Sequence, residues 1–148
     1  MKTRLVLIVF AAAALVFAGL AIAASQESYK VHTKLVGSQE TPKNKSKGTG
    51  SFTGTVVEKG KSKTLTWKLT FKGLSGKALA AHIHLAKKGV AGPVAVPLCG
   101  PCKSGAHGKT KVTEKIVSAL ETHKAYANVH TKKYPNGEIR GQISVTES

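Results

Sequence analysis

Three histidines stand at spacings that suit a metal site. His82 and His84 lie two residues apart in a segment, residues 79–85, that alternates apolar and polar residues. On a β-strand such residues point to the same face. His130 lies in a second alternating segment, residues 125–131. Because all three histidines are out of phase with the apolar residues, neighbouring strands would bring the imidazoles together on one polar face. The pattern therefore predicts a three-histidine surface site for copper or zinc.

A further alternating segment, residues 138–145, supplies polar neighbours for this site. If it forms a hairpin with residues 125–131, only every second register places the two apolar faces on the same side of the sheet. A slip by one residue would turn one strand over. The natural register pairs His130 with Glu138, Asn128 with Arg140 and Tyr126 with Gln142. We expect Asn128, Glu138 and Arg140 to orient the histidine ligands. The alternative is that these are ordinary outward residues of a sheet that binds through its surface.

The only two cysteines form the sequence Cys99-Gly100-Pro101-Cys102. A C-x-x-C pair is a redox motif when it connects a strand to a helix, where the thiol pKa is lowered. Here it follows a predicted strand and enters a loop rich in glycine and lysine, so a structural disulfide is predicted. His32, His107 and His123 belong to no comparable pattern, although His107 follows the cysteines closely.

Period-two alternation dominates the rest of the chain and predicts an all-β fold. Strands are expected near residues 29–35, 52–56, 64–72, 79–85, 94–98, 125–131 and 138–145, and one short helix at 114–122. Residues 41–50 and 100–111 are expected to be mobile loops. The predicted architecture is an antiparallel, Greek-key-like β-sandwich. Its core should consist of Phe52, Val56, Leu65, Trp67, Leu69, Phe71, Ile83, Val129 and Ile139.

The N-terminus has the three parts of a secretory signal. Lys2 and Arg4 precede an uncharged run over residues 5–24, which ends in small residues. We predict a signal peptide over residues 1–24, a polar lead-in over 25–30 and a single domain over 31–148. Because the run is long enough to cross a bilayer, an uncleaved membrane anchor over residues 5–24 is the alternative. Either way the domain is expected to be secreted or otherwise extracytoplasmic.

The mature chain would be strongly basic. Taking Lys2 and Arg4 from the 23 basic residues leaves 21 against 7 acidic ones, a net charge of +14. Of these 21, only Arg140 is an arginine, and lysine suits diffuse attraction to anions better than specific recognition of phosphate. Because the lysines are spread along the chain, we favour a simply solvated cationic surface. Attraction to extracellular polyanions or to an anionic membrane surface is the alternative. Aromatic residues are too scarce for a nucleic-acid groove. No nucleophile elbow, paired carboxylates or phosphate loop is present, so the protein is not expected to be an enzyme, with metal-dependent redox activity as the alternative left open.

Five ordered motifs resemble the CHRD domain, a family named after repeats in chordin and widespread in bacterial exported proteins. They are Leu35-Val36-Gly37-Ser38-Gln39-Glu40-Thr41-Pro42, Ala81-His82-Ile83-His84, Gly92-Pro93-Val94, Ala125-Tyr126-Ala127-Asn128-Val129-His130-Thr131 and Gly137-Glu138-Ile139-Arg140-Gly141-Gln142. The resemblance implies an extracytoplasmic binding module. A weaker likeness to Cu,Zn superoxide dismutase rests on His82 and His84, but the bridging histidine and the zinc ligands of that family have no counterpart. The two functions expected are thus a non-catalytic binding module and a copper- or zinc-binding protein.

Overall fold

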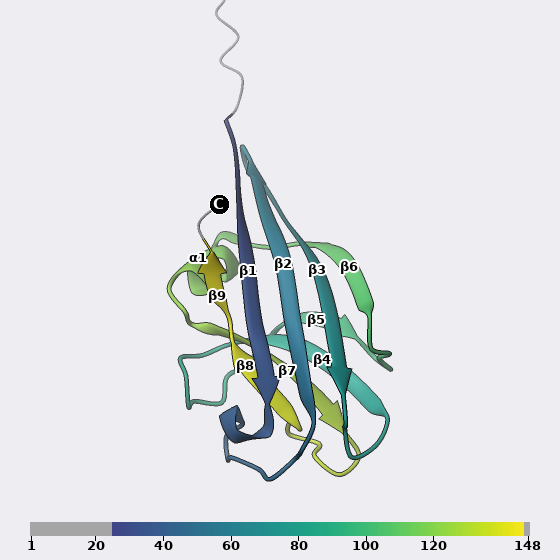
Figure 1. The fold of residues 1–148 in the computed structure, drawn as a ribbon. Coiled ribbons are helices and arrows are strands. Elements are labelled where there is room, and N and C mark those ends of the chain that lie inside the picture. The colour runs from purple at the N-terminus through teal and green to yellow at the C-terminus, as the bar shows by residue number, and fades with distance from the viewer. Residues whose placement is uncertain (1–24, 147–148) are drawn as a thin grey trace, which may run out of the picture.

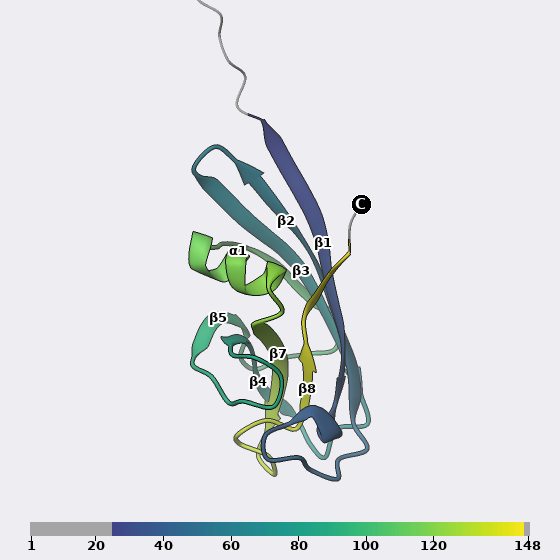
Figure 2. The same ribbon diagram turned by 90° about the vertical axis from the view of Figure 1, so that its left-hand side faces the viewer.

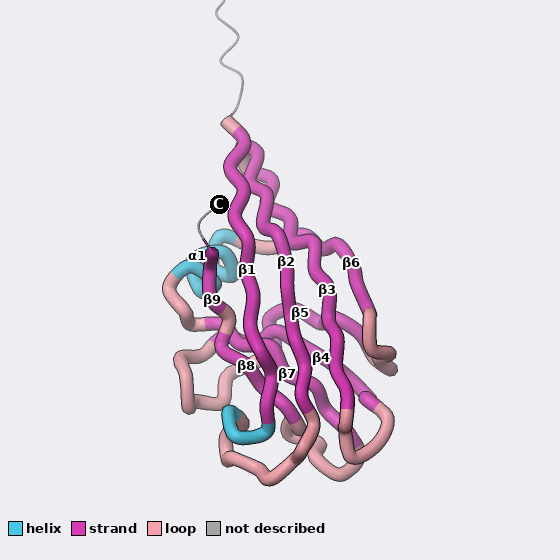
Figure 3. The backbone as a smooth tube through the Cα atoms, viewed as in Figure 1, coloured by secondary structure: helices cyan, strands magenta, loops and turns pink. Residues whose placement is uncertain are grey.

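Alternating apolar and polar residues form antiparallel strands through most of residues 25–146, the part of the chain that the computed structural model describes (Figure 1). In chain order the elements are β1 (Gln26–Val36), η1 (Gly37–Gln39), β2 (Thr49–Lys59), β3 (Ser62–Lys72), β4 (Ala78–Leu85), β5 (Val94–Cys99), β6 (Ala106–Lys111), α1 (Glu114–Glu121), β7 (Ala125–Thr131), β8 (Ile139–Gln142) and β9 (Ser144–Thr146). The predicted all-β class with one short helix is confirmed (Figure 3). The predicted signal or anchor segment lies outside the described residues.

The strands belong to one sheet that folds over on itself. Its order is β5-β4-β7-β8-β1-β2-β3-β6, and β9 pairs with β1. β1, β2, β3 and β6 form one layer and β4, β5, β7 and β8 the other (Figure 2). The layers are joined where Val36 of β1 pairs with Arg140 of β8. The sandwich is therefore a nearly closed sheet, with β5 and β6 as its two edges.

Apolar side chains from both layers fill the space between them. Phe52, Leu65 and Leu69 from one layer and Ile83, Val129 and Ile139 from the other are fully buried. The helix adds Ile116, Val117 and Leu120, and the side chain of Thr113 caps its first turn by accepting a hydrogen bond from the amide of Ile116. Of the predicted core, only Phe71 is not buried; it packs against the edge of the core and is half-exposed.

Three strand predictions differ from the structure. Residues 106–111, expected to be a mobile loop, form β6, which pairs with β3 from Thr64 to Leu69. Its sequence shows no apolar alternation because Gly108 lies under the ring of Trp67, where a β-carbon would come within 2.8 Å of the indole. The strand expected over 138–145 is divided into β8 and β9, since β8 also pairs with β7 whereas β9 pairs only with β1. β1 also begins earlier than expected and includes most of the predicted lead-in.

A buried carboxylate ties three separate segments together at the end of the sheet where β8 begins. Glu138 is fully buried, and its side chain accepts hydrogen bonds from the Ser46 hydroxyl at 2.7 Å and the Thr131 hydroxyl at 2.6 Å. The amide and hydroxyl of Ser75 each donate another at 2.7 Å. Ser46 precedes β2, Ser75 lies between β3 and β4, and Thr131 ends β7. Although burial by itself would raise the pKa of Glu138, these hydrogen bonds lower it below its ordinary value.

Among residues 25–146 there is no helix that is long and apolar enough to span a membrane.

Replacing Glu138 with glutamine should destabilise the fold, because the NH2 group of glutamine would meet two of the hydrogen-bond donors that bind the carboxylate in the wild type. We expect a loss of about 2–4 kcal/mol in the free energy of unfolding at pH 7. Since the folded-state pKa is lowered, the stabilisation is present above the ordinary carboxyl pKa of 4.5 and is lost as the pH falls through the folded value. Urea unfolding at pH 7 and pH 3 measures this, with the exposed Glu27→Gln as control. An equal loss at both pH values would contradict the assignment.

The predicted disulfide is consistent with the structure, in which Cys99 and Cys102 are bonded and their Cα atoms are 5.3 Å apart. The mass of the unreduced protein should be lower by two hydrogens than that of the reduced protein. Alkylation of both thiols without prior reduction would contradict the bond.

Candidate metal centre

The sheet brings the three predicted histidines together. His82 and His84 lie on β4 and His130 on β7, which is hydrogen-bonded to β4 in a register that pairs His82 with Asn128. The ring centroid of His82 is 4.9 Å from that of His130 and 5.6 Å from that of His84, and the His84 and His130 centroids are 6.1 Å apart. One ring nitrogen from each histidine can be chosen so that all three lie within 4.8 Å of one another.

Backbone carbonyls orient two of the rings. Nδ1 of His84 donates to the carbonyl of Gly92 at 2.8 Å, and Nδ1 of His130 donates to the carbonyl of Pro135 at 2.9 Å. A carbonyl only accepts hydrogen bonds, so in each ring the proton is on Nδ1 and the lone pair is on Nε2. This is the arrangement in which a histidine offers Nε2 to a metal while its other nitrogen holds the ring in place.

The third ring completes the cluster. Nδ1 of His82 lies 3.1 Å from Nε2 of His130. Two nitrogens bound to one ion at about 2 Å, with a tetrahedral angle between them, are about 3.3 Å apart. Nε2 of His84 is buried and has no hydrogen-bond partner, and the same is true of Oδ1 of Asn128. A buried lone pair without a partner is costly, and a cation among the three rings would satisfy the one on His84.

His84 packs at the end of a stack of three side chains. The His84 ring stacks on Tyr126 with centroids 4.8 Å apart and planes 7° from parallel. The guanidinium carbon of Arg140 lies 3.4 Å from the centroid of the Tyr126 ring. The hydroxyl of Tyr126 also accepts a hydrogen bond from the amide of Gly92, whose carbonyl orients His84. The Arg140–Tyr126–His84 stack therefore fixes the position and the orientation of the His84 ring.

The segment from Ala86 to Pro93 covers this stack. Arg140 donates to the carbonyls of Lys87 and Val90, and Gln142 donates to that of Ala86. There is no room for a side chain at Gly92, where a β-carbon would lie 2.8 Å from that of Ala86. As a result His84 is only 8% exposed, whereas His82 and His130 are partly open to solvent. The site is thus closed on one side, and the surface site expected from alternation is a half-buried one.

The surroundings of the three imidazoles favour the neutral form of each ring. Burial is the main factor that lowers the pKa of His82, His84 and His130. The neighbouring histidines lower the pKa of His82 further, and His130 and Arg140 do the same for His84. Neutral imidazole is the form that binds a metal ion.

The predicted supporting residues have different outcomes. Asn128 pairs with Arg140 and Tyr126 with Gln142, as expected, and Asn128 lies between His82 and Arg140 across the strands. Arg140 acts through Tyr126 rather than on a histidine directly. Glu138 does not face the histidines, contrary to our expectation: its carboxylate binds Ser46, Ser75 and Thr131. The strand alternation fails there because Glu138 precedes β8 and follows the turn at Gly137, whose φ is +128°.

Sequence reasoning missed the residues that orient the rings. Gly92 and Pro135 act through backbone carbonyls, which carry no side-chain signature. Both lie in loops, and the Gly92-Pro93-Val94 motif was the only signal, for Gly92 alone. His32, His107 and His123 lie outside the cluster, as predicted.

Glu40 is the carboxylate that stands near Arg140. It is 5% exposed, and its Oε1 has no hydrogen-bond partner. Burial raises the pKa of Glu40 to about 7, even though the positive charge of Arg140 and the Thr41 amide act to lower it. The guanidinium instead donates to the Thr41 hydroxyl at 3.3 Å.

A family model described as CHRD domain matches residues 31–143 of the chain. Neither the search of curated proteins nor that of solved structures finds a significant match.

Replacing Glu40 with glutamine should stabilise the protein at alkaline pH. Because the pKa of Glu40 is raised on folding, the contribution of this carboxyl group to stability is fully present below the ordinary value of 4.5. It is lost as the pH rises through about 7. Glutamine resembles the neutral acid and avoids this loss, so we expect a gain of about 1–3 kcal/mol at pH 8 and almost none at pH 4. Thermal unfolding at the two pH values measures the difference, and a stability gain that does not depend on pH would be the contrary result.

Proposed function

Because the chain belongs to the CHRD domain family, we propose that it is an exported, non-catalytic binding module of that family whose ligand is a copper or zinc ion. His82, His84 and His130 are the proposed ligands. The observation that carries the proposal is the approach of three ring nitrogens to within 4.8 Å of one another, on two strands whose register fixes them.

The donor set favours these metals. Three imidazoles offer neutral nitrogen ligands, and neither a carboxylate nor a thiolate belongs to the cluster within the described residues. Calcium and magnesium prefer oxygen ligands, whereas copper and zinc bind imidazole well. For a given nitrogen site copper(II) binds more tightly than zinc, so copper is the expected ligand where both are present. Three protein ligands would leave one position for water or a partner's group.

Residues around the cluster are arranged to hold an ion rather than to transfer protons. Arg140 is separated from His84 by the Tyr126 ring, and Glu138 is occupied by hydroxyl and amide donors. Asn128, which lies between His82 and Arg140 across the strands, does not titrate. This supports a binding role over catalysis.

Export is supported by two features of the chain. The first is the charged, apolar and small-residue sequence of residues 1–24. The second is the Cys99–Cys102 disulfide, a bond that persists in oxidising compartments.

Titration of the purified protein with copper(II) and zinc should give one bound ion per chain. His84→Ala should weaken binding by about 100-fold or more, because the ring removed is the most buried and the best oriented of the three. His107→Ala is the matched control: this histidine lies on β6, outside the cluster, and its loss should leave the affinity unchanged.

Calorimetry measures the affinities, and far-ultraviolet circular dichroism checks that each variant is folded. Calcium and magnesium should not bind at the same concentrations. Copper binding that survives loss of His84 and of His130, or that is lost in His107→Ala, would contradict the proposed site.

A further inference from the structure

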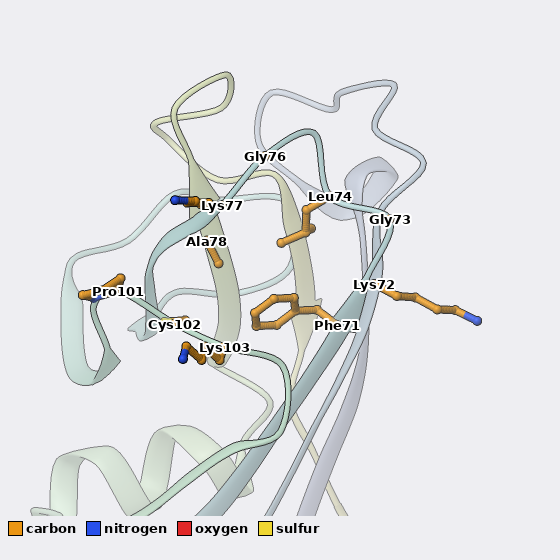
Figure 4. A pocket seen from close by; sticks show the side chains of 10 residues that line it. All are labelled: Phe71, Lys72, Gly73, Leu74, Gly76, Lys77, Ala78, Pro101, Cys102 and Lys103. Atoms are coloured by element: carbon orange, nitrogen blue, oxygen red, sulfur yellow. The ribbon is translucent and has the colours of Figure 1, made fainter.

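A pocket of different chemistry lies at the other end of β4. Its volume is about 790 Å³, within the range of small-molecule sites. The side chains of Phe71, Leu74, Ala78 and Cys102 provide apolar surface (Figure 4). Ala78 and Cys102 are buried, while Phe71 and Leu74 are half-exposed. The pocket therefore reaches from the surface to the edge of the core.

Incomplete closure of the sheet accounts for this opening. β5 and β6 are the two ends of the strand order, and the segment between them crosses from one layer to the other. The amide of Cys102 donates to the carbonyl of Ala78 on β4 at 3.0 Å, and that of Gly105 donates to the carbonyl of Leu69 on β3 at 2.9 Å. The Cys99–Cys102 disulfide braces the same segment. Both walls are thus held by backbone hydrogen bonds, and the space between them is part of the fold.

Cationic side chains accompany the apolar surface. Lys77 and Lys103 lie on the far side of the pocket from Phe71, whereas Lys72 is directed away from it (Figure 4). All three lysines are exposed. The described residues that line the pocket include no carboxylate. An apolar floor with two ammonium groups at its margin complements a molecule that has an apolar tail and one anionic end.

We propose that this pocket binds a free single-chain amphiphilic carboxylate, a fatty-acid anion, with its chain against Phe71, Leu74 and Ala78 and its carboxylate between Lys77 and Lys103. The pocket is concave and bounded by two layers, which suits one flexible chain better than the flat surface of a membrane. The site shares no residue with the histidine cluster, so it stands independently of the metal-binding proposal.

A homologous series of hexanoate, octanoate and decanoate tests the apolar part of the site. Calorimetry on the purified protein should show affinity rising by about fourfold for each added methylene, the factor expected when a methylene leaves water for an apolar surface. Octanamide, which has the same seven-carbon tail as octanoate without its charge, should bind about three- to tenfold more weakly than octanoate. Leu74→Ala should weaken both ligands.

Charge variants test the anionic part. The double variant Lys77→Gln and Lys103→Gln should bind octanoate about three- to tenfold more weakly and octanamide with unchanged affinity. Lys72→Gln should bind both ligands as the wild type does. These surface changes are not expected to impair folding. His84→Ala should bind octanoate normally, which separates this site from the metal centre. Affinity independent of chain length, or equal loss in the Lys72 control, would overturn the proposal. So would binding to anionic phospholipid vesicles without binding to octanoate.

Discussion

The buried carboxylate of Glu138 is the interaction on which the arrangement of this protein most depends. It accepts hydrogen bonds from Ser46, Ser75 and Thr131, which lie before β2, before β4 and at the end of β7. A carboxylate removed from water must satisfy its oxygens within the protein, so each donor has to be in place. The link before β4 and the end of β7 are held at one point as a result. The proposed metal site lies on these two strands, and the apolar pocket borders the start of β4.

Side chains of neighbouring residues along β7 and β8 point to opposite faces of the same sheet. Thr131 turns inward to Glu138, and His130 beside it turns toward His82. Arg140, two residues after Glu138, lies on the covered face, where it supports Tyr126 and through it His84. The carboxylate and the guanidinium are thus kept apart and satisfied by different partners, instead of forming an ion pair. Burial of the three imidazoles lowers the pKa of each.

The two ends of β4 present contrasting chemistry. Near its start, Ala78 borders an apolar pocket with lysines at the margin, which complements an anion with a long tail. Farther along, His82 and His84 offer lone pairs to a cation. In both places the backbone is the rigid part: strand pairing positions β4, and loops fastened to it by carbonyl or amide hydrogen bonds complete each site. Binding is therefore expected to require little rearrangement of the chain.

Alternation with period two was enough to predict most strands, the core from Phe52 to Ile139, the Asn128–Arg140 register and the convergence of three histidines, because burying one face of a strand determines where every side chain on it points. β6 left no apolar pattern to read, because Trp67 leaves no room for a side chain at Gly108, with which it pairs. The roles of Gly92 and Pro135 were invisible because they act through backbone carbonyls. Only the tertiary structure decided that Glu138 faces inward, that the three-histidine cluster is half-buried, and that the sheet stays open between β5 and β6. Each of these depends on contacts between segments far apart in the chain, which local periodicity does not encode.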